Sequence, residues 1–241
     1  MMKCQFKYLH KDIWTHAIDE WPYECCGLIV KDKYVPLKNV HPINQKSNFK
    51  INKGIYFKAL LTHGIQAVIH SHVNHSHLSS TDMIQQKAQG IPWGVAFIDH
   101  NGRRNGIHFW GEGVEKPDLI GRIFVHGLYD CYSLICDWYE KNFKKIQLPF
   151  VPRDYGWWGL EDLVNKHFKE SGFIEIDKDS TLQPGDILFF KMEYDYLSHA
   201  MIYVGEDKLM HHPLKSLSSY LNVHHPFIRR VNNVYRNGGI D

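Results

Sequence analysis

The chain has 241 residues, a formal net charge of +2, 17 histidines, and 44% hydrophobic and 22% charged residues. Its lysines and arginines are scattered rather than grouped, which argues against electrostatic binding to nucleic acid. The start lacks the apolar core of a signal peptide, no apolar run approaches the roughly 18 residues of a membrane span, and the five cysteines are irregularly placed. We therefore expect a protein without a transmembrane segment that is kept in a cytosol with reduced thiols.

The first half of the chain predicts helices interleaved with strands. Apolar residues at three- and four-residue spacings predict an amphipathic helix over 10–21, which Pro22 ends. The other expected elements are strands over 25–30, 34–40, 66–72, 93–98 and 107–110, and helices over 54–63 and from the serine pair 79–80 to 89. This order indicates an α/β domain over 1–112, followed by a glycine- and charge-rich linker over 111–118.

The second half predicts a helix first and an antiparallel sheet afterwards, which is an α+β pattern. An amphipathic helix is expected over 130–143 and a further helix over 159–168. After a turn signal at 183–186, strands are expected over 187–191, 199–204 and 209–212. Each half holds about 110 to 125 residues, enough for its own core. We therefore expect two domains, over 1–112 and 118–241.

A candidate metal site stands at the end of the strand expected over 66–72. His70 and His72 lie two apart, so they point to the same side and can bind one ion. A chain this rich in histidine contains about one His-x-His pair by chance, and a second pair, His75 and His77, follows at once. Asp82 adds a carboxylate at the start of the next helix. Three protein ligands would leave zinc with an open position for water.

Hydrolysis at a zinc ion also needs a general base. Glu24, ahead of the first expected strand, is the best candidate, and the alternative is an ordinary surface glutamate. An acidic residue before a Cys-Gly strand, then His-Ser-His, a loop and Ser-x-x-Asp resembles the JAMM (MPN) metallopeptidase motif. This resemblance implies Zn²⁺ bound by His70, His72 and Asp82. It also implies Glu24 as general base and Ser79 as the serine that helps to stabilise the oxyanion.

The sequence departs from the JAMM motif in two places. Val73 stands where the family usually has proline, and the loop to Ser79 is one residue shorter than usual. Either change could reshape the substrate cleft without removing a ligand. Ser80 remains an alternative for the serine role, and His75 and His77 remain alternatives as metal ligands.

A candidate nucleophile stands at the start of the helix expected over 130–143. Cys131 follows Asp130, a favourable helix N-cap, and the helix dipole and nearby amide groups are expected to favour its thiolate. The other cysteines are more simply packing residues. A thiolate needs a histidine partner and usually a group that orients it. His199 begins an expected strand, and His211 lies in its hairpin partner; alone, each would more often be structural or solvent-exposed.

Together these segments resemble the NlpC/P60 cysteine peptidases. The family's motifs stand here, in order, as Asp130-Cys131, Pro184-Gly185-Asp186, His199 and His211. The resemblance implies a papain-like domain with Cys131 as nucleophile, His199 as base and His211 as the orienting residue. His212 is the alternative for the third role, and the stretch 153–158 is similar to the phage branch of the family.

A JAMM domain followed by an NlpC/P60 domain resembles the tail tip proteins of lambda-like phages that carry two peptidase domains. The resemblance implies a hydrolase with a zinc-dependent peptidase or isopeptidase half and a Cys-His endopeptidase half that cuts peptidoglycan stem peptides. Implied partners are other phage tail tip proteins and a peptidoglycan peptide or protein substrate. The implied location is the host cytoplasm during assembly and the virion tail tip afterwards. The alternatives are a catalytically silent structural component of the tail tip and a cellular cell-wall hydrolase.

Overall fold

The computed structural model describes residues 6–157, 167–191 and 198–239. Contacts group the chain into two compact units, the first formed by Met1–Ser76 and Asp82–Pro117, and the second by His77–Thr81 and Asp118–Asp241. The helix predicted over 159–168 falls largely outside the described residues. Among the described helices, none has both the length and the apolar character needed to cross a membrane.

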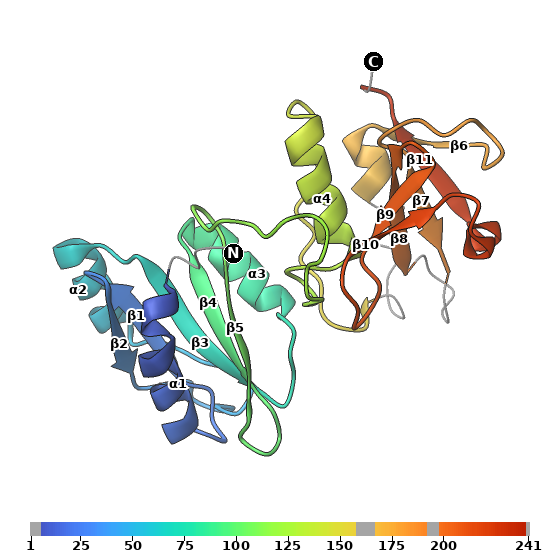
Figure 1. Ribbon diagram of the computed structural model, residues 1–241. Helices are drawn as coiled ribbons and strands as arrows, with labels where there is room; N and C mark the ends of the chain where they lie inside the picture. The colour runs from blue at the N-terminus through green and yellow to red at the C-terminus, as the bar shows by residue number, and fades with distance from the viewer. Residues whose placement is uncertain (1–5, 158–166, 192–197, 240–241) are drawn as a thin grey trace. The chain divides into compact units, whose positions relative to one another are not determined.

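The first unit is a five-stranded mixed sheet with helices (Figure 1). In chain order its elements are a 3-10 helix Lys7–Leu9, α1 His10–Asp19, β1 Cys26–Val30, β2 Lys33–Leu37, α2 Lys53–His63, β3 Ala67–Val73, α3 Ser80–Gln89, β4 Trp93–Ile98 and β5 Arg104–Trp110. The strand order is β2-β1-β3-β4-β5, with β3 and β4 parallel and the other neighbours antiparallel. Every element predicted for this half is present, although β5 begins three residues earlier than expected.

The central strand β3 separates a hydrophobic core from the candidate metal site. All seven of its residues are buried. Ala67 and Ile69 pack with Ile13 and Ala17, the apolar stripe of α1. Because successive side chains of a strand point to opposite faces, His70 and the residue two further on face away from that core. The buried strand thus presents imidazoles on the face that α1 does not cover.

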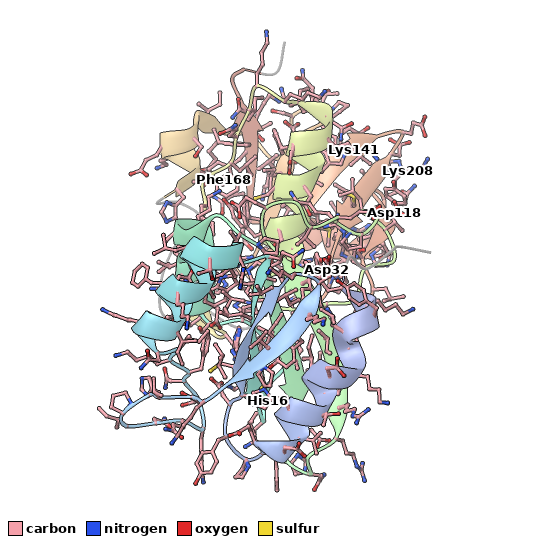
Figure 2. The ribbon with its side chains drawn as sticks, turned by 90° about the vertical axis from the view of Figure 1, so that its left-hand side faces the viewer. His16, Asp32, Asp118, Lys141, Phe168 and Lys208 are labelled. Atoms are coloured by element: carbon pink, nitrogen blue, oxygen red, sulfur yellow. The ribbon has the colours of Figure 1, made fainter. Side chains whose placement is uncertain are left out.

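The glycine of the Cys-Gly pair that begins β1, Gly27, is required for steric reasons. A Cβ at Gly27 would lie 2.5 Å from the ring of Tyr34, so no larger residue fits without moving that ring. The hydroxyl of Tyr34 lies 2.8 Å from Nδ1 of His16 on α1, and Figure 2 labels His16. Gly27 therefore leaves room for the ring of Tyr34, whose hydroxyl reaches α1.

The second unit places a helix against a six-stranded antiparallel sheet of order β10-β9-β8-β7-β11-β6 (Figure 1). Its elements are α4 Cys131–Asn142, a 3-10 helix Lys169–Ser171, β6 Phe173–Ile176, β7 Ile187–Phe190, β8 His199–Gly205, β9 Lys208–His211, β10 Ser219–Asn222, a 3-10 helix Pro226–Arg230 and β11 Asn233–Asn237. The helix and three strands predicted here are present as α4, β7, β8 and β9. The strands β6, β10 and β11, each of four or five residues, were not predicted.

The core of the second unit lies between α4 and β8. Leu134, Ile135 and Tyr139 of α4 pack with Ala200 and Ile202 of β8, and all five are buried. Phe168, labelled in Figure 2, joins the same cluster. This packing places the first residue of α4 beside the first residues of β8, where the cysteine site is expected.

Candidate functional site

The first unit brings together the three predicted metal ligands. His70 and His72 extend from the same face of β3, and Asp82 lies in the first turn of α3. The two histidine Nε2 atoms lie 3.0 Å apart. The carboxylate oxygens of Asp82 lie 3.4 Å from Nε2 of His70 and 3.2 Å from Nε2 of His72. All three side chains are buried.

The donor set of this cluster fits zinc. The three ligand atoms lie within 4.8 Å of one another, and tetrahedral ligands at about 2.0–2.1 Å from Zn²⁺ stand about 3.3 Å apart. The two nitrogens lie 3.0 Å apart, and each lies 3.2 to 3.4 Å from a different carboxylate oxygen of Asp82, which is close to that spacing. Aromatic rings fix the first imidazole, because Phe49 stacks on His70 at 4.6 Å between ring centroids and Trp93 meets it edge-on. Two imidazole nitrogens and the carboxylate therefore form a donor set of the kind that binds zinc.

Glu24 lies beside the cluster and is buried. The antiparallel register pairs Cys26 with His70, so continuing it by two residues brings Glu24 opposite His72. Glu24 is only 1% exposed, so the alternative of an ordinary surface glutamate is wrong. Its Oε1 atom accepts no hydrogen bond from any described residue. Burial raises the pKa of Glu24 to about 8, with His72 opposing that shift and Asp82 adding to it.

The serine predicted to stabilise the oxyanion lies in a segment that contacts group differently from the metal ligands. Ser79 and its alternative Ser80 lie in the segment 77–81, which is grouped with the second unit. The first unit by itself thus brings together the three ligands and the glutamate, and the role of Ser79 stays a prediction. His75 remains close by, with its ring centroid 4.7 Å from that of His72.

The second unit brings together the predicted nucleophile and base. Asp130 caps α4, because its side chain accepts a hydrogen bond from the backbone N–H of Ser133 at 2.9 Å. Cys131, the next residue, keeps limited solvent access and is otherwise surrounded by protein. It lines one pocket with His199, the first residue of β8, and with Trp157. The Asp130 cap fixes where α4 begins and so where Cys131 lies. The packing of α4 on β8 then brings His199 to the same pocket.

The two groups rest in their neutral forms. Burial and the adjacent Asp130 carboxylate raise the pKa of Cys131 to about 11. Burial, with further lowering from His211 and His212, brings the pKa of His199 to about 3. Backbone hydrogen bonds from Ala200 and Tyr132 lower the pKa of Cys131, as expected of nearby amide groups, but burial has the larger effect.

The third predicted residue also lies at the site. The ring centroids of His199 and His211 lie 5.8 Å apart, with 65° between the ring planes. His211 ends β9, where it pairs with Met201 of β8. His212, the alternative, is buried and meets the ring of Phe124 instead. The geometry favours His211 for the orienting role.

Sequence reasoning missed Arg153 as part of this site. Its guanidinium donates to both carboxylate oxygens of Asp130 at 2.7 Å, to Oγ of Ser133 at 2.9 Å and to the carbonyl of Val151 at 2.8 Å. Arg153 is buried and lines the pocket that contains Cys131. The resemblance of the stretch 153–158 to phage sequences was the only signal, since no spacing rule connects it to the helix start.

Known proteins resemble this chain over most of its length. The family model described as NlpC/P60 family matches residues 113–236. Tail tip assembly protein K of Escherichia phage N15 is 28% identical over 214 residues, which cover 86% of this chain and 84% of that protein. Tail tip assembly protein K of Escherichia phage lambda is 30% identical over 174 residues, covering 71% and 81%. A crystal structure of an NlpC/P60 family protein from Bacillus cereus ATCC 10987 matches with a TM-score of 0.35 and 14% identity, covering 90% of this chain and 64% of that one.

Proposed function

The chain belongs to the NlpC/P60 family, and we propose that its second unit cuts peptide bonds in the peptidoglycan stem. Cys131 is the proposed nucleophile, His199 the base and His211 the orienting residue. The observation that carries this proposal is the pocket shared by Cys131 and His199, with the ring of His211 beside that of His199.

The proposed reaction starts from the neutral thiol and imidazole. His199 takes the proton of Cys131 as the sulfur attacks the carbonyl carbon, so that a carbon–sulfur bond forms. The carbon–nitrogen bond then breaks as His199 returns the proton to the leaving amine. Water hydrolyses the thioester, which releases the acid and restores the thiol. Coupling the proton transfer to the attack avoids forming a buried ion pair before substrate arrives.

We further propose that the first unit is a zinc-dependent peptidase or isopeptidase of the JAMM type. His70, His72 and Asp82 would hold the ion, and Zn²⁺ when bound supplies a Lewis acid and lowers the pKa of a bound water. Glu24 is the proposed acceptor of that water's proton, because its Oε1 is buried and accepts no hydrogen bond from the described residues. Ser79 is the proposed oxyanion-stabilising residue, and this proposal is based only on the resemblance of the sequence to the JAMM motif.

The names of the two phage relatives support a tail tip assembly role. We propose that this chain is a tail tip component, present in the host cytoplasm during assembly and in the virion tail afterwards, with other tail tip proteins as partners. The alternative is a structural component of the tail tip that has the same fold but does not cleave a substrate. The joint presence of Glu24, the metal ligand set and the Cys131–His199 pocket favours active sites.

Digestion of purified peptidoglycan tests the cysteine half. The wild type, Cys131→Ala and Glu24→Gln are incubated with the same material, and released stem peptides are identified by mass spectrometry. Wild type and Glu24→Gln should release the same peptides, and Cys131→Ala should release none. Equal release by wild type and Cys131→Ala would show that the second site is assigned wrongly. No release by any of them would support the structural alternative.

A further inference from the structure

We propose that Ser219 is a positioning residue of the cysteine site: its hydroxyl accepts from Nε2–H of His211, which leaves the lone pair of that ring on Nδ1, available to the N–H that His199 carries when it takes a proton. The inference rests on the proposed function of the second unit and deepens it. Ser219 was not among the residues predicted from the sequence, and it belongs to β10, a strand that the sequence did not predict.

The sheet register places Ser219 beside the proposed catalytic residues. Met201 of β8 pairs with His211 of β9, and His211 pairs with Ser219 of β10. These three residues form one row across the sheet, with their side chains on one face. His199 precedes Met201 by two residues, so it shares that face. The row therefore leads from Ser219 through His211 to His199.

The two ring nitrogens of His211 have different surroundings. Its Nε2 lies 3.2 Å from Oγ of Ser219. Its Nδ1 is buried and has no hydrogen-bond partner among the described residues. A neutral imidazole carries one N–H and one acceptor nitrogen. If Nε2–H donates to Ser219, the lone pair stands on the buried Nδ1, on the ring whose centroid is 5.8 Å from that of His199.

The chemistry of the base requires this tautomer. When His199 takes the thiol proton of Cys131 on one ring nitrogen, its other nitrogen carries an N–H that needs an acceptor. A lone pair on Nδ1 of His211 supplies that acceptor, whereas the other tautomer would set N–H against N–H. Burial, with the nearby His225, lowers the pKa of His211, which keeps its ring neutral as the role requires.

The neighbouring serine offers a matched control. Ser218 is 1% exposed, and its Oγ accepts a hydrogen bond from the backbone N–H of Arg122 at 2.8 Å. Replacing Ser218 with alanine thus removes a buried hydrogen bond one residue away from Ser219 without removing the hydroxyl that lies beside His211. If losing a hydrogen bond merely destabilised this part of the fold, Ser218→Ala and Ser219→Ala should both change the signals of His211. A tautomer effect should appear in Ser219→Ala alone.

Long-range proton–nitrogen NMR of the full chain tests the inference. In the wild type we expect His211 to carry its proton on Nε2. Ser219→Ala should move both nitrogen signals toward a mixture of tautomers, Ser219→Thr should restore the wild-type pattern, and Ser218→Ala should not change it. A proton on Nδ1 in the wild type, or identical spectra for the wild type and Ser219→Ala, would overturn the inference.

Alkylation of Cys131 by iodoacetamide at fixed pH gives a second measurement. Loss of one hydrogen bond of about 1 kcal/mol corresponds to a rate reduced by about fivefold in Ser219→Ala. An unchanged rate would contradict the positioning role. Neither measurement requires turnover of a substrate. A Ser219-dependent tautomer in a chain that does not cleave peptidoglycan would therefore leave this inference standing while the proposed substrate fails.

Discussion

Arg153 binds both carboxylate oxygens of Asp130, the residue immediately before the proposed nucleophile. Both side chains are buried, so the ion pair is shielded from water. Burial would raise the pKa of Asp130, but Arg153 and His126 outweigh it and hold the pKa below the usual range. Asp130 therefore stays charged while it caps α4, and the arginine offsets a negative charge beside Cys131.

We expect Arg153→Met to destabilise the second unit by about 3–5 kcal/mol, because the Asp130 carboxylate is left buried and unpaired. The double variant Asp130→Asn, Arg153→Met should recover part of that loss, since no charge remains buried. The free energy of unfolding in urea measures both. As a control, Lys208→Met breaks an exposed ion pair with Glu206 and should leave stability unchanged. Equal losses in the single and double variants would contradict the charge argument.

The raised pKa of Cys131 predicts how its alkylation depends on pH. A thiol with a pKa of about 11 has only about one thousandth of its population as thiolate at pH 8. The rate with iodoacetamide should rise about tenfold per pH unit and reach no plateau below pH 9. Mass spectrometry of the peptide containing Cys131 measures the rate, with Cys131→Ser as the control. A plateau near pH 7 would mean that the site rests as a thiolate.

Zinc should stabilise the first unit. An ion that binds only the folded state, at a free concentration of about 100 times its Kd, adds about 2.7 kcal/mol to the free energy of unfolding. Thermal unfolding with and without Zn²⁺ should show this shift in the wild type and not in Asp82→Ala. Asp99→Ala is the matched control, because Asp99 accepts hydrogen bonds from backbone N–H groups of its own turn. A wild type that does not respond to zinc would refute the metal site.

Acid should weaken the first unit through His108. Burial, with His10 nearby, lowers the pKa of His108 to about 4 in the folded chain, against about 6.5 when unfolded. Between these two pKa values the unfolded chain binds more protons than the folded chain. The stability that neutral His108 contributes is therefore fully present above pH 6.5 and is lost as the pH drops toward 4. Between pH 7.5 and 5.5 the wild type should lose about 1 kcal/mol more than His108→Phe. Parallel pH profiles of the two in urea unfolding would exclude this contribution.

Local patterns in the sequence were sufficient for the elements that carry the candidate sites. The apolar spacing of α1 and α4 and the buried run of β3 depend only on near neighbours. His70 and His72 share a face because a strand repeats every two residues, and Cys131 begins a helix because Asp130 caps it. These relationships involve residues within a few positions of one another, so the sequence by itself determined them.

Tertiary structure decided the relationships between distant residues. Arg153 reaches Asp130, and Ser219 reaches His211, only after strands and helix have packed in register. The raised pKa of Cys131 was also decided there, because the burial that raises it depends on every element around the pocket. Periodicity specifies which way a side chain points, but pairing between elements specifies what it meets, and that pairing has no local signal.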